Sequence, residues 1–382
     1  MNMYNKVSVV KCSSYDLELV CEKLRESIEL LGGFDRFIGP GSRVLLKPNM
    51  LTAYSPERAA TTHPAILEAV IILLKELGVK IFVGDSPGIE NVKKFVGYHR
   101  TLKIVGFLDV IKRHGVEFLE FKESTPPPIK KNYIFKSIEV ARQALEVDAI
   151  INLPKLKTHT QMFLTLCIKN MFGCVVGKRK AQWHLHAGKD FMYFARMLTE
   201  VYDSVRPTLN IMDGIVAMEG NGPGNGKTRK LNLLLISNDG VALDRVVCEI
   251  VKVDPECLLT LKAAREIGCG ETELNKIEVV GESISSVQVS DFAFPHMIGV
   301  DEMGPSFMRS YYKNLVTSKP KEDRDKCTLC ENCIDACPTQ LIVKRDGFLK
   351  FDYDKCIRCY CCVEVCPFDA MTIQHGFLTS LI

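Results

Sequence analysis

The residues with the clearest chemical signature are cysteines in the C-terminal part of the chain. Nine of the sixteen cysteines lie between Cys327 and Cys366. Eight of these nine form two runs with the same spacing, and in each run a proline follows the fourth cysteine. The runs are Cys327, Cys330, Cys333, Cys337 and Cys356, Cys359, Cys362, Cys366. This spacing is typical of chains that hold 4Fe–4S clusters through thiolates, so the pattern predicts two such clusters.

Each run is expected to give three ligands to one cluster and its fourth ligand to the other. Gaps of two residues let three thiolates of one short loop face a single cubane, and the proline turns the fourth cysteine away. One predicted ligand set is therefore Cys327, Cys330, Cys333 and Cys366. The other predicted set is Cys356, Cys359, Cys362 and Cys337. Cys361 stands outside the pattern and is interpreted as a spare thiol.

Structural zinc is the alternative for cysteines at this spacing. A tetrahedral zinc site uses two CxxC pairs, which leaves the third and fourth cysteines and the proline of each run without a role. The duplicated pattern favours a small ferredoxin fold, with short hairpin strands near 341–343 and 372–373. The other seven cysteines are scattered and are expected to pack as small apolar residues. Metal-site spacing without a recognisable signal sequence predicts a reducing, cytoplasmic location.

Polar side chains suited to binding and acid–base chemistry recur in the first 250 residues. They follow segments with the pattern of strands, where an α/β fold places its ligand site. These candidates are Lys47, Asn49, Asp85, Lys155, Lys157, His159, Lys169, Asn170, Asp213, Glu219, Asn221 and Asp244. The lysines and the histidine predict a cationic pocket for a carboxylate or a phosphate.

Two groups of roles are expected within this set. The predicted catalytic residues are His159, Lys157, Lys169, Asp213 and Glu219. His159 is the candidate for proton transfer, because the reference pKa of histidine lies near physiological pH. The carboxylates, with Asp244, balance the lysines, act as acid and base, or hold a divalent cation. The residues predicted to bind the substrate or cofactor are Lys47, Asn49, Asp85, Lys155, Asn170, Asn221 and Asp244. A buried ion-pair network that fixes loop geometry is the structural alternative.

These residues lie in motifs that resemble a known family. The motifs are Lys47-Pro-Asn49, Leu153-Pro-Lys155-x-Lys157-Thr-His159, Thr165-x3-Lys169-Asn170-x-Phe-Gly173, Trp183-His184 and Asp213-Gly-Ile-x-Ala-Met-Glu219-Gly-Asn221-Gly-Pro223. Together they resemble domain-of-unknown-function family 362 over roughly residues 44–250. The resemblance implies kinship with iron–sulfur proteins that often carry a C-terminal ferredoxin domain, and it implies no particular reaction.

The elements that must position these residues alternate between strands and helices. Strands are predicted at 43–47, 79–84, 149–153, 209–212, 231–237 and 276–280, and helices at 64–77, 190–205, 241–251 and 258–267. This alternation predicts an α/β fold with a mainly parallel sheet and helices on both faces. We place this domain at residues 1–316, a polar linker at 317–326, and a small α+β ferredoxin-like two-cluster domain at 327–376.

Composition and two rejected motifs argue against other classes of protein. The formal net charge of +3 gives no support for a nucleic-acid partner, and the longest apolar run, 65–74, is too short to cross a membrane. The segment 221–228 nearly matches a phosphate-binding loop, but it leads into a predicted strand instead of a helix. No G-x-G-x-x-G segment follows a strand, so a nicotinamide cofactor lacks support. His184 and His186 are expected on a surface loop.

Functions from different classes fit these observations. In the first, the chain is an oxidoreductase that delivers low-potential electrons from its clusters to an anionic substrate or cofactor in the α/β domain. In the second, it is a non-catalytic electron carrier or assembly factor, and the large domain is a docking platform. Redox-independent catalysis is a third interpretation. The expected partners are a redox protein or a small anionic molecule, with no nucleic acid and no membrane, and the sequence predicts no oligomeric state.

Overall fold

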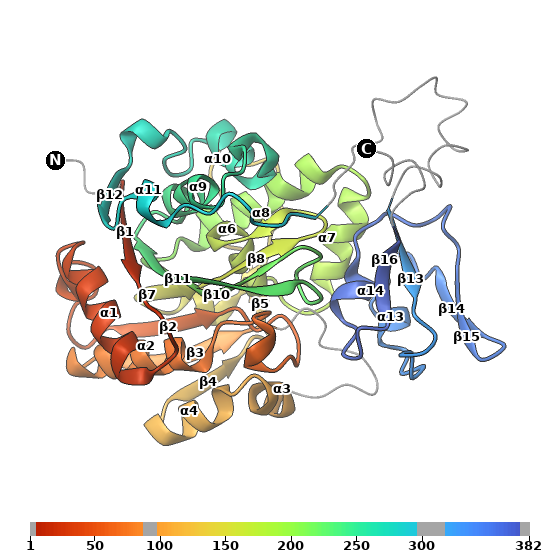
Figure 1. Ribbon diagram of the computed structural model, residues 1–382, viewed down its shortest axis with the longest axis horizontal. Coiled ribbons are helices and arrows are strands. Elements are labelled where there is room, and N and C mark those ends of the chain that lie inside the picture. The colour runs from red at the N-terminus through yellow and green to blue at the C-terminus, as the bar shows by residue number, and fades with distance from the viewer. Residues whose placement is uncertain (1–4, 87–97, 296–317, 375–382) are drawn as a thin grey trace.

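The computed structural model describes residues 5–86, 98–295 and 318–374. Figure 1 shows a large α/β domain and a smaller module formed by the C-terminal part of the chain. The large domain is built on a mixed, mainly parallel sheet with helices on both faces, which confirms the α/β fold class predicted from the sequence.

The large sheet has eight strands side by side and two more beside its centre. They are β1 (Lys6–Lys11), β2 (Arg43–Pro48), β3 (Lys80–Asp85), β4 (Glu117–Glu120), β7 (Ala149–Leu153), β8 (Lys155–His159), β9 (Phe163–Thr165), β10 (Leu209–Glu219), β11 (Lys227–Ser237) and β12 (Glu278–Gly281). The order is β12-β1-β11-β10-β7-β2-β3-β4. The strands β10, β7, β2, β3 and β4 are parallel, whereas β11 is antiparallel to both neighbours. β8 runs parallel to β10, and β9 pairs with β8.

Helices cover both faces of this sheet. One face packs on α1 (Leu17–Glu29), α2 (Pro64–Glu76), α3 (Tyr98–Ile104) and α4 (Phe107–His114). The other packs on α6 (Cys167–Asn170), α7 (Arg179–Ala187), α8 (Phe191–Val205), α9 (Gly240–Ile250), α10 (Leu259–Ile267) and α11 (Ile284–Val287), with α5 (Arg142–Leu145), β5 (Ser124–Thr125) and β6 (Val140–Ala141) nearby. Successive residues of a strand point to opposite faces, so Val44 and Leu46 join one core and Leu45 joins the other.

The four predicted helices are present as α2, α8, α9 and α10, each with ends within one residue of the prediction. Their N-terminal caps explain this agreement. The side chains of Asp190 and Asp239 accept hydrogen bonds from the first free backbone N–H groups of α8 and α9, and His63 does the same for α2, where Pro64 follows.

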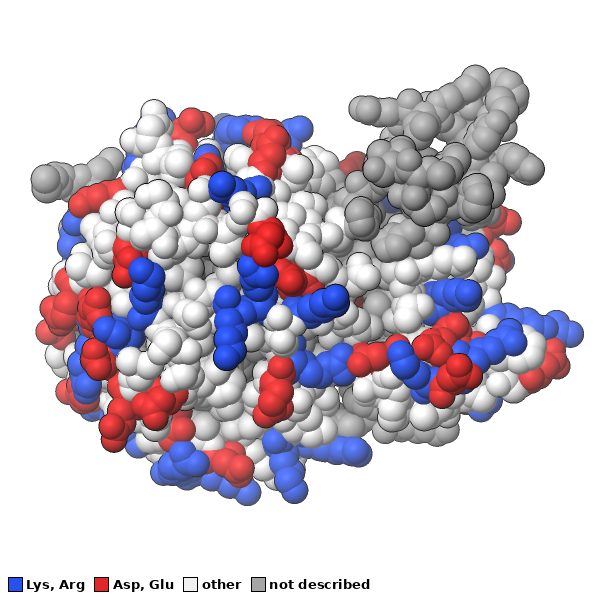
Figure 2. Space-filling view, in the orientation of Figure 1, with Lys and Arg blue, Asp and Glu red and all other residues white. Residues whose placement is uncertain are grey.

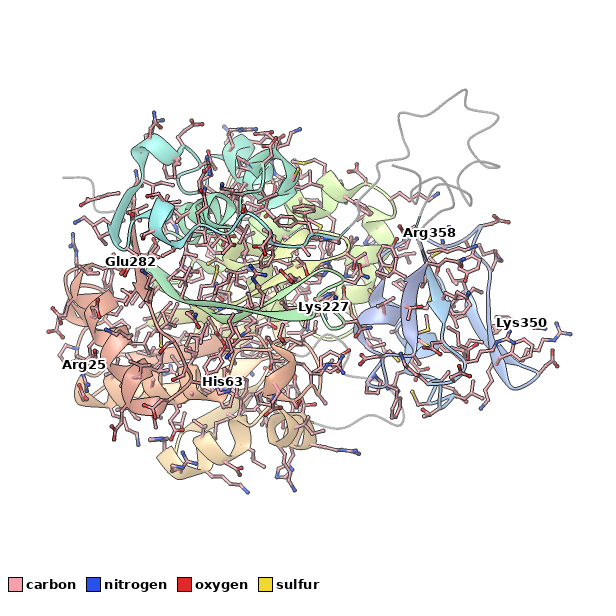
Figure 3. The ribbon with its side chains drawn as sticks, in the orientation of Figure 1. Arg25, His63, Lys227, Glu282, Lys350 and Arg358 are labelled. Carbon is pink, nitrogen blue, oxygen red and sulfur yellow. The ribbon has the colours of Figure 1, made fainter. Side chains whose placement is uncertain are left out.

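The sequence patterns missed β1 and α1, and they underestimated β10 and β11, which have 11 residues each. Beyond Gly214 these two strands continue as a hairpin arm that ends with Glu219 opposite Lys227. The first residues of β11 are polar and partly exposed, so their strand character is hidden in the sequence. Figure 3 labels Lys227 at the tip of this arm, on the side of the small module.

The small module consists of two antiparallel pairs of strands and two short helices. β13 (Lys319–Glu322) pairs with β16 (Met371–Gln374), β14 (Ile342–Arg345) pairs with β15 (Phe348–Phe351), and the helices are α13 (Asn332–Asp335) and α14 (Cys361–Glu364). The predicted linker at 317–326 therefore needs correction. Its segment Lys319–Glu322 is a strand of the module, because pairing with β16 satisfies its backbone groups.

Charge and hydropathy of the described residues agree with the composition. Figure 2 shows basic and acidic side chains mixed over the visible face of both parts, without a broad patch of one sign. In the part of the chain that the structure describes, no helix combines the length and apolar character needed to cross a membrane.

Candidate functional site

A pocket lies where the large domain meets the small module. From the large domain it is lined by residues that follow β2 and β3, by β8 and by the segment of α6 and α7. The module closes it with Ala336, Cys361, Glu364 and Val365, which come from α13, α14 and the residues after them. The cavity measures about 100 Å³. This is room for a few water molecules or one small polar molecule.

The pocket brings together seven of the twelve candidates of the large domain. These are Lys47, Asn49, Asp85, Lys157, His159, Lys169 and Asn170. They come from segments more than 120 positions apart in sequence, such as Lys47 and Asn170. The carboxyl ends of neighbouring parallel strands meet at one edge of the sheet, and this explains their convergence.

One wall of the pocket is a fixed polar network. Lys47 Nζ lies 2.8 Å from Asp85 Oδ1, and both side chains are almost fully buried. Asn170 accepts a hydrogen bond of 2.8 Å from Asn49 Nδ2. Gly173 is required beside this pair, because a Cβ atom there would come within 2.1 Å of Asp85 Oδ1 and 2.5 Å of Lys47 Nζ. The paired Lys47 and Asp85 thus shape the site more than they offer charge to a ligand.

Two further lysines of the pocket, Lys157 and Lys169, have no carboxylate partner among the described residues. Lys157 Nζ donates to Asn49 Oδ1 at 3.0 Å and to the carbonyl oxygen of Ala60, but it has no carboxylate partner among the described residues. Burial lowers the pKa of Lys157 well below its usual value, and the charge of Lys169 lowers it further. Burial also lowers the pKa of Lys169, although Glu364 opposes this shift. A bound anion would stabilise the charged form of both lysines.

His159 is held in one tautomer by the backbone. Its Nδ1 accepts hydrogen bonds from the N–H groups of Gln161 and Met162, at 3.1 and 3.2 Å, so the ring proton is on Nε2. Nε2 lies 3.1 Å from Glu364 Oε1. Burial lowers the pKa of His159 to about 4. A second proton on Nδ1 would displace both backbone donors, so Nδ1 is held as an acceptor, whereas Nε2 and Glu364 Oε1 make no hydrogen bond among the described residues.

Glu364 remains ionised in this setting. Burial raises its pKa, but His159 and Lys169 outweigh burial and bring the pKa to about 2. Its carboxylate is therefore a fixed negative charge contributed by the small module to a pocket with four lysines.

Several buried polar atoms of the pocket have no hydrogen-bond partner. They include Thr165 Oγ1 and His184 Nδ1, on residues that are only 3% and 6% exposed. Lys169 Nζ likewise makes no hydrogen bond or ion pair within the described residues. Buried polar groups are rarely left unsatisfied in native proteins, so these atoms point to a ligand or bound water.

Lys155 and Asp213 lie outside the pocket in a separate network. Lys155 Nζ is 2.8 Å from Asp213 Oδ2 and 2.8 Å from Tyr15 Oη, and Tyr15 donates to Asp213 Oδ1 at 2.8 Å. The backbone N–H of His63 also donates a hydrogen bond to Asp213 Oδ2. The rings of His63 and Tyr15 stack with their centroids 3.6 Å apart. Lys155 and Asp213 therefore form the buried ion-pair network that the sequence analysis named as the alternative to a binding role.

The register of β8 explains why Lys155 and Lys157 separate. Lys155 lies opposite Asp213 on β10, but Lys157 lies opposite Met218, so five positions of β10 match two positions of β8. This irregularity moves the two lysines into different surroundings. No sequence pattern indicates this irregularity.

The last three candidates also lie away from the pocket. Asp244 accepts hydrogen bonds from the backbone N–H groups of Cys167 and Ile168 and so fixes the start of α6, and burial raises its pKa to about 7. Glu219 accepts from the backbone of Ala293, and Asn221 lines a shallow groove between the arm and the module. Asp213, Glu219 and Asp244 therefore do not meet, and among the described residues no three His, Cys, Asp or Glu side chains are grouped to hold a metal ion.

The eight cysteines surround two separate cavities in the module. One is lined by Cys327, Cys330, Cys333 and Cys366, and the other by Cys356, Cys359, Cys362 and Cys337. Each cavity thus combines three thiols of one run with the fourth of the other. Four thiols around each cavity match the donor set of a cubane.

Sequence analysis missed residues that the module and α7 contribute. Lys180 and His184 are four positions apart and face the pocket from α7, which corrects the expectation of a surface loop for His184. His186 is exposed on the same helix. Cys361, interpreted as a spare thiol, lines the pocket with Glu364. The signal available for Cys361 and Glu364 was their position between cluster cysteines.

Comparisons with known proteins agree with the motif analysis. Residues 44–249 match the family model described as "Domain of unknown function (DUF362)", and residues 319–367 match "4Fe-4S dicluster domain". The chain is 36% identical over 321 residues to "Thylakoid-associated protein sll1697" of Synechocystis sp., covering 84% of this chain and 97% of that protein. Among solved structures, the lactate racemase apoprotein from Thermoanaerobacterium thermosaccharolyticum matches with 11% identity and a TM-score of 0.41, over 62% of this chain and 55% of that chain.

Proposed function

This chain belongs to the DUF362 family and carries a 4Fe–4S domain, and from that premise we propose that it is an iron–sulfur oxidoreductase. In this proposal the module holds two 4Fe–4S clusters, and the pocket holds a small anionic molecule that is oxidised or reduced. One observation carries the proposal: Cys361 and Glu364 line the pocket, and both lie within two positions of the cluster cysteine Cys362. Because neighbours of a cluster ligand line the pocket, the pocket borders the proposed cluster site, which favours electron exchange between a cluster and a pocket ligand.

The cysteines of the module are proposed to hold the clusters in the two sets that border the two cavities. Bound clusters of this type supply single electrons at low potential. The protein tunes such a centre through burial and hydrogen bonds to sulfur. Cys356, Cys359 and Cys362 are all less than a tenth exposed, so one set provides a well-shielded site.

The large domain is proposed to bind and orient the anionic molecule. Lys157 and Lys169 offer positive charge, since neither has a carboxylate partner among the described residues. Lys47 and Asp85 hold the wall of the pocket, and Asn170 links this wall to the chain after β2. His159 Nε2 lies 3.1 Å from Glu364 Oε1 and so places an imidazole beside the module's carboxylate. Desolvation within the pocket would strengthen each of these interactions.

A redox protein is the proposed external partner. Cys327 and Cys330 are half-buried, in contrast to Cys356 and Cys359, and Phe368 beside the same cavity is 45% exposed. Exposure of a cluster edge favours electron exchange with another protein. The same observation favours the second candidate, a non-catalytic electron carrier, in which the pocket ligand is structural. A cytoplasmic location stays part of the proposal.

Anaerobic purification followed by iron and acid-labile sulfide analysis tests the cluster assignment. We expect about eight irons and eight sulfides per chain, and a coupled signal in the EPR spectrum of the dithionite-reduced protein. Cys362→Ala should lose about half of the iron, whereas the neighbouring Cys361→Ala should keep it. Zinc in place of iron, or equal iron loss in both variants, would contradict the assignment.

Analysis of small molecules released from the same preparation separates the two candidate functions. The oxidoreductase predicts an anionic compound that is retained by the unaltered protein and lost from Lys169→Gln. The retained compound should change oxidation state when the protein is reduced and then reoxidised. A retained compound that never changes oxidation state would favour the carrier.

A further inference from the structure

The lining of the pocket has unsatisfied polar groups from three different elements. They are Thr165 at the end of β9, Lys169 in α6 and His184 in α7. Thr165 Oγ1 and His184 Nδ1 are buried without a hydrogen-bond partner. Burial lowers the pKa of His184 to about 3, so its ring is neutral and has one N–H donor and one acceptor nitrogen. These groups together can receive one small polar group.

The number of lysines without a protein partner indicates the charge of the ligand's polar group. Four lysines line the pocket, but three of them have protein acceptors. Lys47 pairs with Asp85, Lys157 donates to Asn49 and Ala60, and Lys180 donates to the hydroxyl and carbonyl oxygens of Ser86. Lys169 is the only lysine of this pocket without a hydrogen bond or ion pair among the described residues. A single available ammonium group matches a monoanion better than a phosphate dianion.

Part of the remaining lining of the pocket is apolar. Met50, Leu51, Phe172, Pro223 and Val365 contribute to its lining. The rings of Phe172 and His184 meet edge to face, with centroids 5.8 Å apart. A ligand with its charged end at Lys169 would therefore place an apolar body among these side chains, with Cys361 and Glu364 of the module at the same cavity.

We infer that Thr165, Lys169 and His184 form a carboxylate subsite, and that the pocket selects small monocarboxylates with an apolar body. This inference deepens the proposed function and rests on it, because it names the class of molecule that the redox pocket binds. The ammonium of Lys169 donates to the carboxylate, and the hydroxyl of Thr165 and the ring N–H of His184 donate to it as well.

Isothermal titration calorimetry on the anaerobically purified full-length protein tests the subsite. The probes are benzoate and butyrate, each compared with its uncharged amide, and inorganic phosphate. We expect at least one carboxylate to bind, its amide to bind at least about 10-fold more weakly, and phosphate to bind more weakly than the carboxylate. Using one aromatic and one aliphatic probe keeps the result independent of the shape of a single ligand.

Matched variants test which side chains contribute to carboxylate binding. Lys169→Gln should weaken carboxylate binding by about 10- to 100-fold, and Thr165→Val and His184→Gln by about 3- to 10-fold. The controls are Lys178→Gln and His186→Gln, which change exposed residues of the same types beside α7 and should leave binding unchanged. Circular dichroism of every variant checks that the fold is retained.

Three outcomes overturn the subsite: neither carboxylate binds, the amides or phosphate bind as tightly, or Lys169→Gln behaves like Lys178→Gln. Failure of the proposed function looks different. If a carboxylate binds through Lys169 while the iron content or the reduced EPR signal is absent, the redox proposal fails and the carboxylate subsite stands.

Discussion

Lys155 and Lys157 lie two positions apart on β8, yet they belong to two regions with opposite properties. Lys155 is in the buried network of Tyr15, His63 and Asp213, where each charged group has close partners inside the large domain. Lys157 faces the pocket, where Lys169, Thr165 and His184 have unsatisfied atoms and the small module forms one side. Burial of a charged side chain therefore indicates a binding role only where the side chain lacks hydrogen-bond and ion-pair partners within the protein.

The difference follows from what each region must do. A fully paired network stabilises a single arrangement of β8 against β10 and the chain before α2. A pocket with unpaired donors is less stable by itself, and a ligand supplies the missing acceptors. The two regions should accordingly differ in their response to mutation and to loosening of the module.

The largest effect is expected from breaking the network at Asp213. Asp213→Asn leaves the ammonium of Lys155 buried without its carboxylate, and we expect the free energy of unfolding to fall by about 3–5 kcal/mol. Urea denaturation under anaerobic conditions measures this change. Glu219→Gln is the matched control, because it alters a carboxylate of the same strand whose one hydrogen bond among the described residues comes from the backbone of Ala293. Equal losses in both variants would contradict the comparison.

Acid should destabilise the protein through its buried neutral histidines. Burial lowers the pKa of His63 in the network to about 4 and that of His184 in the pocket to about 3. The unfolded chain binds protons at these histidines near pH 6.5, so their contribution to stability is complete above pH 6.5 and is lost as the pH falls toward the folded pKa. At full protonation these differences correspond to about 3 kcal/mol for His63 and about 5 kcal/mol for His184.

Unfolding midpoints measured from pH 7 to pH 4 test this pH dependence. His184→Gln should flatten the curve, whereas His186→Gln, which alters an exposed histidine on the same helix, should follow the unaltered protein. Coincident curves for all three proteins would contradict this, because they would show that His184 has the same pKa in the folded and unfolded states.

Loosening the module should affect the pocket and spare the network. Tyr54 Oη donates to the backbone oxygens of Glu364 and Cys366, at 3.2 and 3.0 Å. Tyr54→Phe removes both hydrogen bonds, which is worth about 1 kcal/mol, and should speed iron release to a chelator about five-fold. Tyr193→Phe, on the exposed side of α8, should not change the rate. An unchanged rate in Tyr54→Phe would show that this contact does not hold the module.

The smallest effect on stability is expected at Lys169. Because its ammonium has no hydrogen bond or ion pair within the described residues, Lys169→Gln should change the free energy of unfolding by less than about 1 kcal/mol. The same variant is expected to lose ligand binding. A loss of several kcal/mol would place Lys169 in a structural network like that of Lys155.

Local sequence patterns predicted the α/β fold, the helices with clear caps and the convergence of Lys47, Asn49, Asp85 and Lys157 at strand ends. The same patterns did not predict features that depend on contacts between segments distant in sequence. The separation of Lys155 from Lys157 depends on the register between β8 and β10, and the position of Asp244 depends on the start of α6. No periodicity in the sequence reports either of these features.

The closure of the pocket by the module was also beyond prediction. Glu364 and Cys361 were obscured by the stronger cysteine pattern around them, and their place in the pocket depends on how the two parts pack. His184 and Lys180 lie on a helix with many polar residues, so their burial was hidden. In each case the missing information was a contact between segments distant in sequence.

EPR spectroscopy of the reduced protein with and without a bound carboxylate tests the central claim, that the pocket and the iron–sulfur module form one site. Benzoate or butyrate, whichever calorimetry shows to bind, is added at saturation, and the midpoint potential and line shape are compared. The account predicts a shift in the unaltered protein and in Lys178→Gln, and no shift in Lys169→Gln at the same concentration. Identical spectra and potentials in the unaltered protein, with the carboxylate bound, would contradict it.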